Sequence, residues 1–184
     1  MVARKHHGSL SPEFALLGLL YDQPSHGYEL HRQLTEDLGY VWHISLSQTY
    51  NILNRMEIAG DITSSSLDHV KPPPRQVVQI TLQGRERFDD WLDHSTGSSV
   101  RAIRLEFITR LYFVRKLHPQ RTALLLDAQA NEIKSVIKNL ERIQVELPAT
   151  QLFNFLSMKL RINQLRSALE WIGECRNVIE DSFS

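Results

Sequence analysis

Residues 45–60 decide the fold of this chain, and they read SLSQTYNILNRMEIAG. Ser45 and Gln48 have the spacing of a capping box, and Gly60 can end a helix in the left-handed conformation. Four residues recur at helical spacing and are expected to pack inward: Thr49, Ile52, Leu53 and Met56. The opposite side is a polar stripe without an acidic residue: Gln48, Asn51, Asn54 and Arg55. We therefore predict a helix to Ala59 with one core face and one polar face.

Two helices are expected before this segment. Ser11 followed by Pro12 is a helix start, because Ser can cap free N–H groups and Pro fits the first helical position. The helix it begins, through Leu20, is apolar on nearly all sides and should lie inside the domain. A second helix is predicted from about His26 to Leu38, with Gly39 ending it in the left-handed conformation.

After Gly60 the hydrophobic period changes to about two, which predicts a hairpin ending near Leu82. Its tip, residues 67–74, carries Lys71 and three prolines, and Arg75 follows. Thr81 can then cap a fourth helix from Gln83 to about His94. The inward residues of this helix should be Phe88, Trp91 and Leu92.

Residues 95–99 have linker composition, so we place a domain boundary there and expect domains at 1–95 and 96–184. Helices are predicted from Arg101 to Leu117, from Pro119 to Pro148 and from about Ala149 to Asp181. The two long helices carry apolar stripes that one small neighbour should not cover, which predicts an antiparallel long-helix dimerisation domain. The residues expected to form the dimer contact are Leu126, Ile133, Ile137, Leu140, Phe155, Ile162, Leu165, Leu169 and Ile172.

Three helices, a hairpin with a basic tip and a closing helix follow the order of a winged helix-turn-helix domain. The fold class is therefore mainly α with a small β-hairpin. In such domains the third helix enters the major groove and the wing lies along the phosphate backbone. Gln and Asn amides match an adenine edge, and Arg can reach guanine or phosphate. The residues expected to bind DNA are Ser47, Gln48, Thr49, Tyr50, Asn51, Asn54, Arg55, Lys71 and Arg75.

The charge balance excludes a broad basic coat. The chain has 21 Lys and Arg against 21 Asp and Glu. Through Ser95 there are 8 basic and 12 acidic residues, and from Thr96 onward 13 and 9, so the halves carry formal charges of −4 and +4. DNA binding should therefore depend on a few well-placed groups and on dimerisation.

The sequence has no motif typical of a metal site, a disulfide or a catalytic site. No pair among the eight His has metal-ligand spacing, and the single Cys175 cannot form an internal disulfide. Neither a phosphate-cradling Gly loop nor a nucleophile elbow occurs. We predict no enzyme, cofactor or metal, no membrane span, and a cytoplasmic location. The three Trp could line an effector pocket, although aromatic residues at helical spacing are usually core.

Several motifs resemble the PadR family of transcriptional regulators. They are residues 26–30 (HGYEL), Tyr50 followed by Leu53, Arg55, Met56, Glu57 and Gly60, and the strand from Arg75 to Thr81 before Gly84 and Arg85. Residues 39–42 and 48–50, with the helical tail, are closest to the virulence-activator branch. The resemblance implies a dimer with an N-terminal winged domain and a C-terminal helical dimerisation domain, and it implies that Tyr50 contacts backbone phosphate. Some relatives bind aromatic ligands between the two domains, so a small aromatic effector is a candidate partner that no motif here assigns.

The leading hypothesis is a homodimeric regulator, of repressor type, that binds double-stranded DNA at an approximately palindromic operator. Two third helices would enter successive major grooves about 34–36 Å apart. One alternative is a protein-interaction module that keeps the winged scaffold without binding DNA. Another is a sensor in which small-molecule binding is primary.

Overall fold

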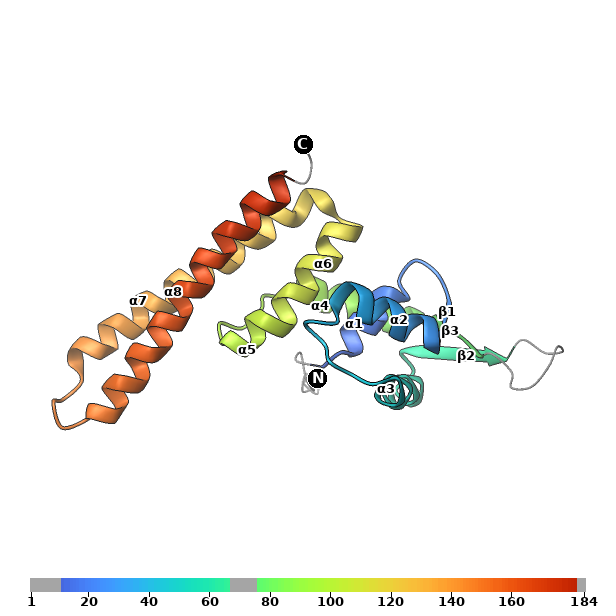
Figure 1. Cartoon of the computed structure of the whole chain (residues 1–184), viewed down its shortest axis with the longest axis horizontal. Helices are drawn as coiled ribbons and strands as arrows, with labels where there is room; N and C mark the ends of the chain where they lie inside the picture. The colour runs from blue at the N-terminus through green and yellow to red at the C-terminus, as the bar shows by residue number, and fades with distance from the viewer. Residues whose placement is uncertain (1–10, 67–75, 182–184) are drawn as a thin grey trace. The chain divides into compact units, whose positions relative to one another are not determined.

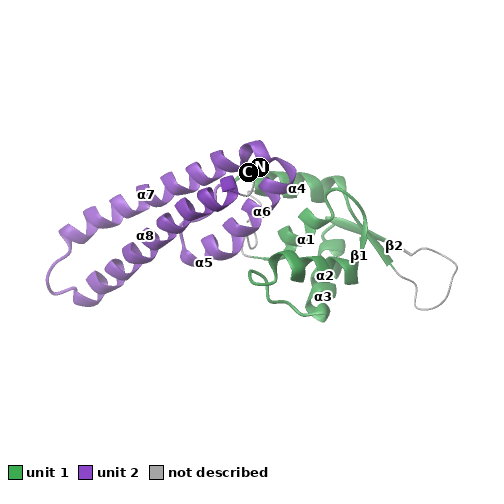
Figure 2. Ribbon diagram, turned by 45° about the horizontal axis from the view of Figure 1, so that its top comes forward, with its two compact units in different colours: residues 1–94 green, residues 95–184 purple. Residues whose placement is uncertain are grey.

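The computed structural model describes residues 11–66 and 76–181. The chain divides into two compact units, residues 1–94 and 95–184, coloured separately in Figure 2. This division falls one residue before the boundary drawn from the linker composition.

The N-terminal unit consists of helices packed beside a small antiparallel sheet (Figure 1). Its helices are α1 (Glu13–Leu19), α2 (Gly27–Leu38), α3 (Leu46–Ile58) and α4 (Leu82–Asp93). Its strands are β1 (Ser25–His26), β2 (Ile62–Ser66) and β3 (Gln76–Ile80), in the order β1-β3-β2. The predicted fold class is confirmed. The two-residue strand β1, which pairs Ser25 with Val78 and His26 with Val77, was not predicted.

The core of this unit is built from the apolar faces that the periodicity indicated. Ile52, Leu53 and Met56 of α3 are buried, as predicted. The inward residues of α4 are also buried, and the Trp91 ring stacks on Phe14 of α1 with ring centroids 4.7 Å apart. Trp42 is buried as well. Trp42 and Trp91 are therefore core residues, which was the expected alternative to an effector pocket.

The predicted helix ends at Gly60 and Thr81 are confirmed, whereas the one at Gly39 is wrong. Gly60 has a φ of 80°, the left-handed conformation predicted for it. Thr81 caps α4 by accepting a hydrogen bond from the Gly84 amide at 3.0 Å. Gly39, however, has a φ of −63°, so the left-handed end predicted there is wrong. The chain turns there because the amides of Val41 and Trp42 both donate to the carbonyl oxygen of Leu38.

The C-terminal unit is entirely helical where it is described. Its elements are α5 (Val100–Ala102), the π-helical turn η1 (Ile103–Phe107), α6 (Ile108–Leu117), the 3-10 turn η2 (Pro119–Arg121), α7 (Thr122–Glu146) and α8 (Leu152–Asp181). Figure 1 shows α7 and α8 lying side by side as an antiparallel hairpin. Ion pairs join them, from Arg166 to Glu141 at 2.6 Å and from Arg176 to Asp127.

The prediction that the apolar stripes of the two long helices form the dimer contact is corrected by the burial of their residues. Seven of them are buried within a single chain: Leu126, Ile133, Ile137, Leu140, Ile162, Leu165 and Ile172. Leu169 is partly buried against the same cluster. The two long helices cover each other's stripes, with help from Ile103 and Phe107, so these residues form the core of the protomer. Only Phe155, 39% exposed, remains at the surface.

A charged pair is buried beside the π-helical turn. The guanidinium of Arg110 is fully buried and donates to a Glu106 carboxylate oxygen at 2.8 Å and to Thr96 Oγ1 at 2.5 Å. Burial lowers the pKa of Arg110, and the charge and hydrogen bond of Glu106 act in the opposite direction. The helical segment of residues 100–117 therefore buries the charged residues Glu106 and Arg110 as well as its apolar residues.

Among residues 11–66 and 76–181, no helix is both long enough and apolar enough to cross a membrane.

Candidate nucleic-acid interface

The polar side of α3 is exposed along its length. Its middle consists of Ser47, Asn51 and Asn54, all exposed. On a helix with 100° per residue these three side chains fall within about 60° of one another, directly opposite the buried residues. They present one hydroxyl and two amides to solvent, groups that can hydrogen-bond to base edges.

A capping box fixes the start of this face. Ser45 Oγ accepts from the Gln48 amide at 3.2 Å, and Gln48 Oε1 accepts from the Ser45 amide at 2.8 Å. The predicted box is therefore confirmed. It has a consequence for Gln48, because its side-chain carbonyl is already engaged and its NH₂ group is the part that remains to face DNA.

Thr49 does not lie on the exposed face. Its side chain is fully buried, and its hydroxyl donates to the carbonyl oxygen of Ser45 at 3.2 Å and pairs with His31 Nδ1 at 3.0 Å. The expectation that Thr49 contacts DNA is thus corrected, whereas the expectation that it packs inward is confirmed. Its contact with His31 joins α3 to α2.

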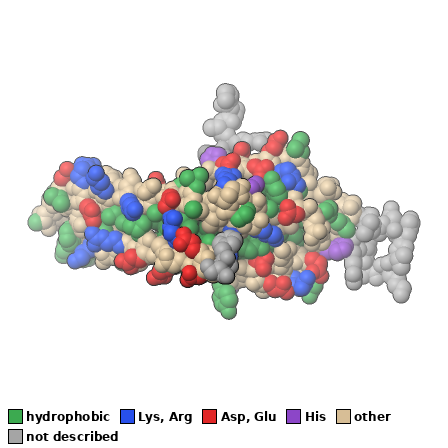
Figure 3. All heavy atoms as spheres, turned by 90° about the horizontal axis from the view of Figure 1, so that it is seen from above, with side chains coloured by type: hydrophobic (Ala, Val, Ile, Leu, Met, Phe, Trp, Pro, Cys, Tyr) green, Lys and Arg blue, Asp and Glu red, His purple; other side chains and the backbone are tan. Residues whose placement is uncertain are grey.

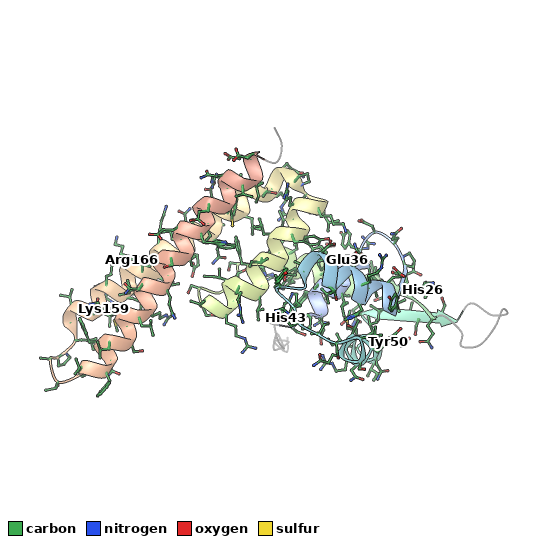
Figure 4. The ribbon with its side chains drawn as sticks, in the orientation of Figure 1. His26, Glu36, His43, Tyr50, Lys159 and Arg166 are labelled. Atoms are coloured by element: carbon green, nitrogen blue, oxygen red, sulfur yellow. The ribbon has the colours of Figure 1, made fainter. Side chains whose placement is uncertain are left out.

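Tyr50 lies on one flank of α3 and is half exposed (Figure 4). Its ring packs against Gly27, the first residue of α2. A Cβ at position 27 would lie 2.7 Å from Tyr50 Cε1 and 3.3 Å from Leu53 Cδ1, so the absence of a side chain there admits the ring. The same flank carries Glu57, whose carboxylate accepts from the Ser64 amide at 3.0 Å and ties α3 to β2.

Arg55 lies on the opposite flank and belongs to an ion network. Its Nη2 is 3.4 Å from Glu13 Oε1, and Glu13 Oε2 is 2.8 Å from Arg87 Nη2. Arg87 also pairs with the buried Asp61. Burial lowers the pKa of Arg87, but the hydrogen bond to Glu13 and the charges of Asp61 and Glu13 outweigh it, so the net pKa is raised. The network joins α1, α3, α4 and the residue that precedes β2.

Lys71 and Arg75, expected at the wing, lie outside the described residues. The strands leading to the tip are described to Ser66 and from Gln76. At the second of these, His26 Nδ1 lies 3.1 Å from the carbonyl oxygen of Gln76, which joins the start of α2 to the wing.

Sequence reasoning did not identify Glu13 or His26 as neighbours of this interface. Each contacts a residue about 40 or 50 positions away, and no local pattern marks such a pairing. Tertiary structure alone brings them together.

The charged side chains of the visible face are mixed in sign. Figure 3 shows Lys and Arg interspersed with Asp and Glu on this face, without a continuous basic patch among the residues described. In the described part of the chain, no group of three or more His, Cys, Asp or Glu side chains could hold a metal ion.

Comparisons with known proteins agree with this geometry. Residues 16–90 match the family described as "Transcriptional regulator PadR-like family", and residues 103–180 match the one described as "Virulence activator alpha C-term". The chain is 26% identical to a probable transcriptional regulator of Mycobacterium tuberculosis over 186 residues, covering 91% of this chain and 96% of that protein. It is 25% identical over 138 residues to the negative transcriptional regulator PadR of Bacillus subtilis, covering 75% of each.

A crystal structure of Bacillus subtilis PadR in complex with operator DNA is similar at 22% identity and a TM-score of 0.45, covering 91% of this chain and 98% of that one. The two family matches together span most of the chain and correspond to its two compact units. The chain thus carries a PadR-like transcriptional regulator domain over residues 16–90 and a virulence-activator C-terminal domain over residues 103–180, and the proteins it matches are transcriptional regulators, not enzymes.

Proposed function

We propose that this protein is a homodimeric repressor that binds an approximately palindromic operator through α3. The observation that carries the proposal is the uncharged outer face of α3, formed by Ser47, Asn51 and Asn54 and exposed along its length. Such a face is poised to read base edges in a major groove. Tyr50 on the flank, with Lys71 and Arg75 of the wing, would then contact phosphate.

One relative supports the proposal that this protein is a repressor. The Bacillus subtilis protein is named a negative regulator, and its crystal structure was obtained with operator DNA. A repressor of this kind acts at its operator, so we place this protein in the cytoplasm.

We propose dimerisation through a surface that shares only Phe155 with the residues predicted from the sequence. The start of α8 exposes a row of large apolar side chains: Leu152, Phe153, Phe155, Leu156 and Leu160. Their exposed fractions run from 39% to 82%, and contiguous exposed apolar surface of this kind marks protein interfaces. We propose that a second copy covers this row.

An effector site is proposed in the C-terminal unit. A groove of about 460 Å³ lies there, with an apolar lining that includes Ile103, Ile108 and Trp171 and a cation at Arg104. This volume is within the range of small-molecule sites. The Bacillus subtilis relative has been crystallised with p-coumaric acid, and an aromatic acid would suit this lining. A thermal shift with aromatic acids that disappears in Arg104→Gln would support the assignment, and no shift with any such acid would contradict it.

The experiment that tests DNA reading is Asn51→Ala. A lost base contact should reduce the preference for the operator by about 1–3 kcal/mol, whereas Lys71→Ala should weaken all duplexes alike. The probe is the duplex upstream of the protein's own gene, compared with a scrambled duplex of equal length. The matched control is Asn177→Ala, which removes an exposed amide from α8.

An unchanged preference in Asn51→Ala would contradict base reading by α3. If the wild-type protein binds neither duplex, the protein-interaction module becomes the better account.

A further inference from the structure

The position of Arg55 around α3 separates it from the base-reading face. Arg55 follows Ser47 by eight residues, which places it about 80° around the helix from Ser47. Ser47, Asn51 and Asn54 point directly away from the core, whereas Arg55 points sideways toward α1. The observed contact agrees, because the Arg55 guanidinium lies 3.4 Å from Glu13 at the start of α1.

The Arg55 guanidinium balances the negative charge of the group formed by Glu13, Asp61 and Arg87. Asp61 and Glu13 are two carboxylates with side-chain exposures of 2% and 18%, and both pair with the single guanidinium of Arg87. Those three groups carry a net charge of −1, which Arg55 neutralises. If Arg55 moved to a DNA phosphate, the uncompensated negative charge would be left beside a polyanion, where it is unfavourable.

The other contacts of α3 show what this ion pair adds. Thr49 joins α3 to α2 through His31, and Glu57 joins it to β2 through Ser64. Tyr50 packs against Gly27 on the flank that carries Glu57. The ion pair between Arg55 and Glu13 joins α3 to α1 on the opposite flank, so α3 has contacts with its neighbours on both flanks.

We propose that Arg55 is a positioning residue, whose ion pair with Glu13 sets the rotation of α3 about its axis and so aims Asn51 and Asn54 at the bases. Arg55 makes no phosphate contact of its own. This inference rests on the proposed function, and it reassigns the direct DNA contact that the sequence predicted for Arg55.

The test uses the full-length chain and four variants: Arg55→Gln, Arg55→Lys, Glu13→Gln and the double variant Arg55→Gln/Glu13→Gln. Binding to the upstream duplex and to the scrambled duplex is measured over a series of salt concentrations. Circular dichroism confirms that each variant is folded at the assay temperature. Glu86→Gln is the matched control, because it removes an exposed carboxylate of α4 in the same unit.

Arg55→Gln and Glu13→Gln should each weaken binding to the upstream duplex by up to about fivefold, the effect expected for an exposed ion pair. The double variant should be no weaker than either single one, because both remove the same interaction. Binding to the scrambled duplex and the salt slope should not change, and Arg55→Lys should restore part of the loss. Should Glu13→Gln fail to fold, the comparison of Arg55→Gln with Arg55→Lys carries the test through the salt slope.

Two results would overturn the assignment. If Glu13→Gln binds more tightly and Arg55→Gln lowers the salt slope by about 0.9, Arg55 is a phosphate contact that Glu13 competes for. If no variant differs from wild type, the ion pair does not position α3. A wild-type protein that binds neither duplex would instead refute the proposed function, which keeps the two failures distinct.

Discussion

Replacing Glu106 by Gln should destabilise the C-terminal unit far more than a surface change of the same kind. Arg110 is fully buried and the Glu106 side chain is 5% exposed, with 2.8 Å between Nη2 and Oε1. Glutamine preserves the size and a hydrogen-bond acceptor but removes the negative charge that Glu106 places beside the buried guanidinium. Breaking one partner of a buried pair costs about 3–5 kcal/mol, a large share of the roughly 5–15 kcal/mol that stabilises a typical domain.

Urea denaturation followed by circular dichroism measures this loss. The matched control is Glu141→Gln, which removes a carboxylate that is 44% exposed and pairs with Arg166, and it should cost no more than about 1 kcal/mol. Replacing both buried partners, as Glu106→Leu/Arg110→Met, should cost less than Glu106→Gln because the two charges of the pair are removed together. If Glu106→Gln costs no more than Glu141→Gln, the carboxylate charge of Glu106 does not stabilise the buried Arg110.

Three further changes test separate parts of the account. Ser45→Ala removes the cap of α3 and should lower the free energy of unfolding by about 1 kcal/mol, measured by thermal melting, and no change would show that the box adds nothing. Ile133 has no exposed surface, so Ile133→Ala should lower the free energy of unfolding by about 2–5 kcal/mol, measured by urea denaturation. Leu124 is 68% exposed, and Leu124→Ala should lower it far less. Equal losses in the two variants would contradict a core between α7 and α8. Tyr50→Phe removes only a hydroxyl and should weaken operator and scrambled duplexes alike, by about 1.5 kcal/mol if the hydroxyl bonds to phosphate, and unchanged gel-shift affinities would refute that contact.

Local signals in the sequence predicted most of the secondary structure. The Ser45 and Gln48 box and the Thr81 cap depend on residues three apart, so their partners are visible in the sequence. Strand β1 was missed because two residues cannot show a period. Gly39 was assigned the wrong backbone conformation because either backbone region can end a helix, and Leu38 accepts both following amides.

The stripes on α7 and α8 show the limit of periodicity. It identified the apolar positions correctly but not what covers them. Ile133 and Ile162 belong to one core cluster of a single chain. The apolar stripes therefore indicate that α7 and α8 pack on each other within the protomer, and they do not indicate a dimer contact. The exposed row around Phe153 could not be distinguished from core positions without knowing which side of α8 faces α7.

The candidate site was predictable only in part. Asn51 and Asn54 lie on the exposed face, as the stripe indicated. Thr49 is buried and Arg55 pairs with Glu13, 42 positions away. Pairings at such distances depend on the packing of α1 against α3, which periodicity along one helix does not contain.

The most direct test of the central claim is a salt titration of wild-type binding to the duplex upstream of the protein's own gene, beside the scrambled duplex. Sequence-specific binding by α3 and the wing predicts that the logarithm of the association constant falls linearly with the logarithm of salt concentration, with a slope of about −0.9 for each phosphate contact. It also predicts that the upstream duplex binds more tightly throughout. A flat response, or equal affinity for both duplexes, would contradict sequence-specific DNA binding by α3.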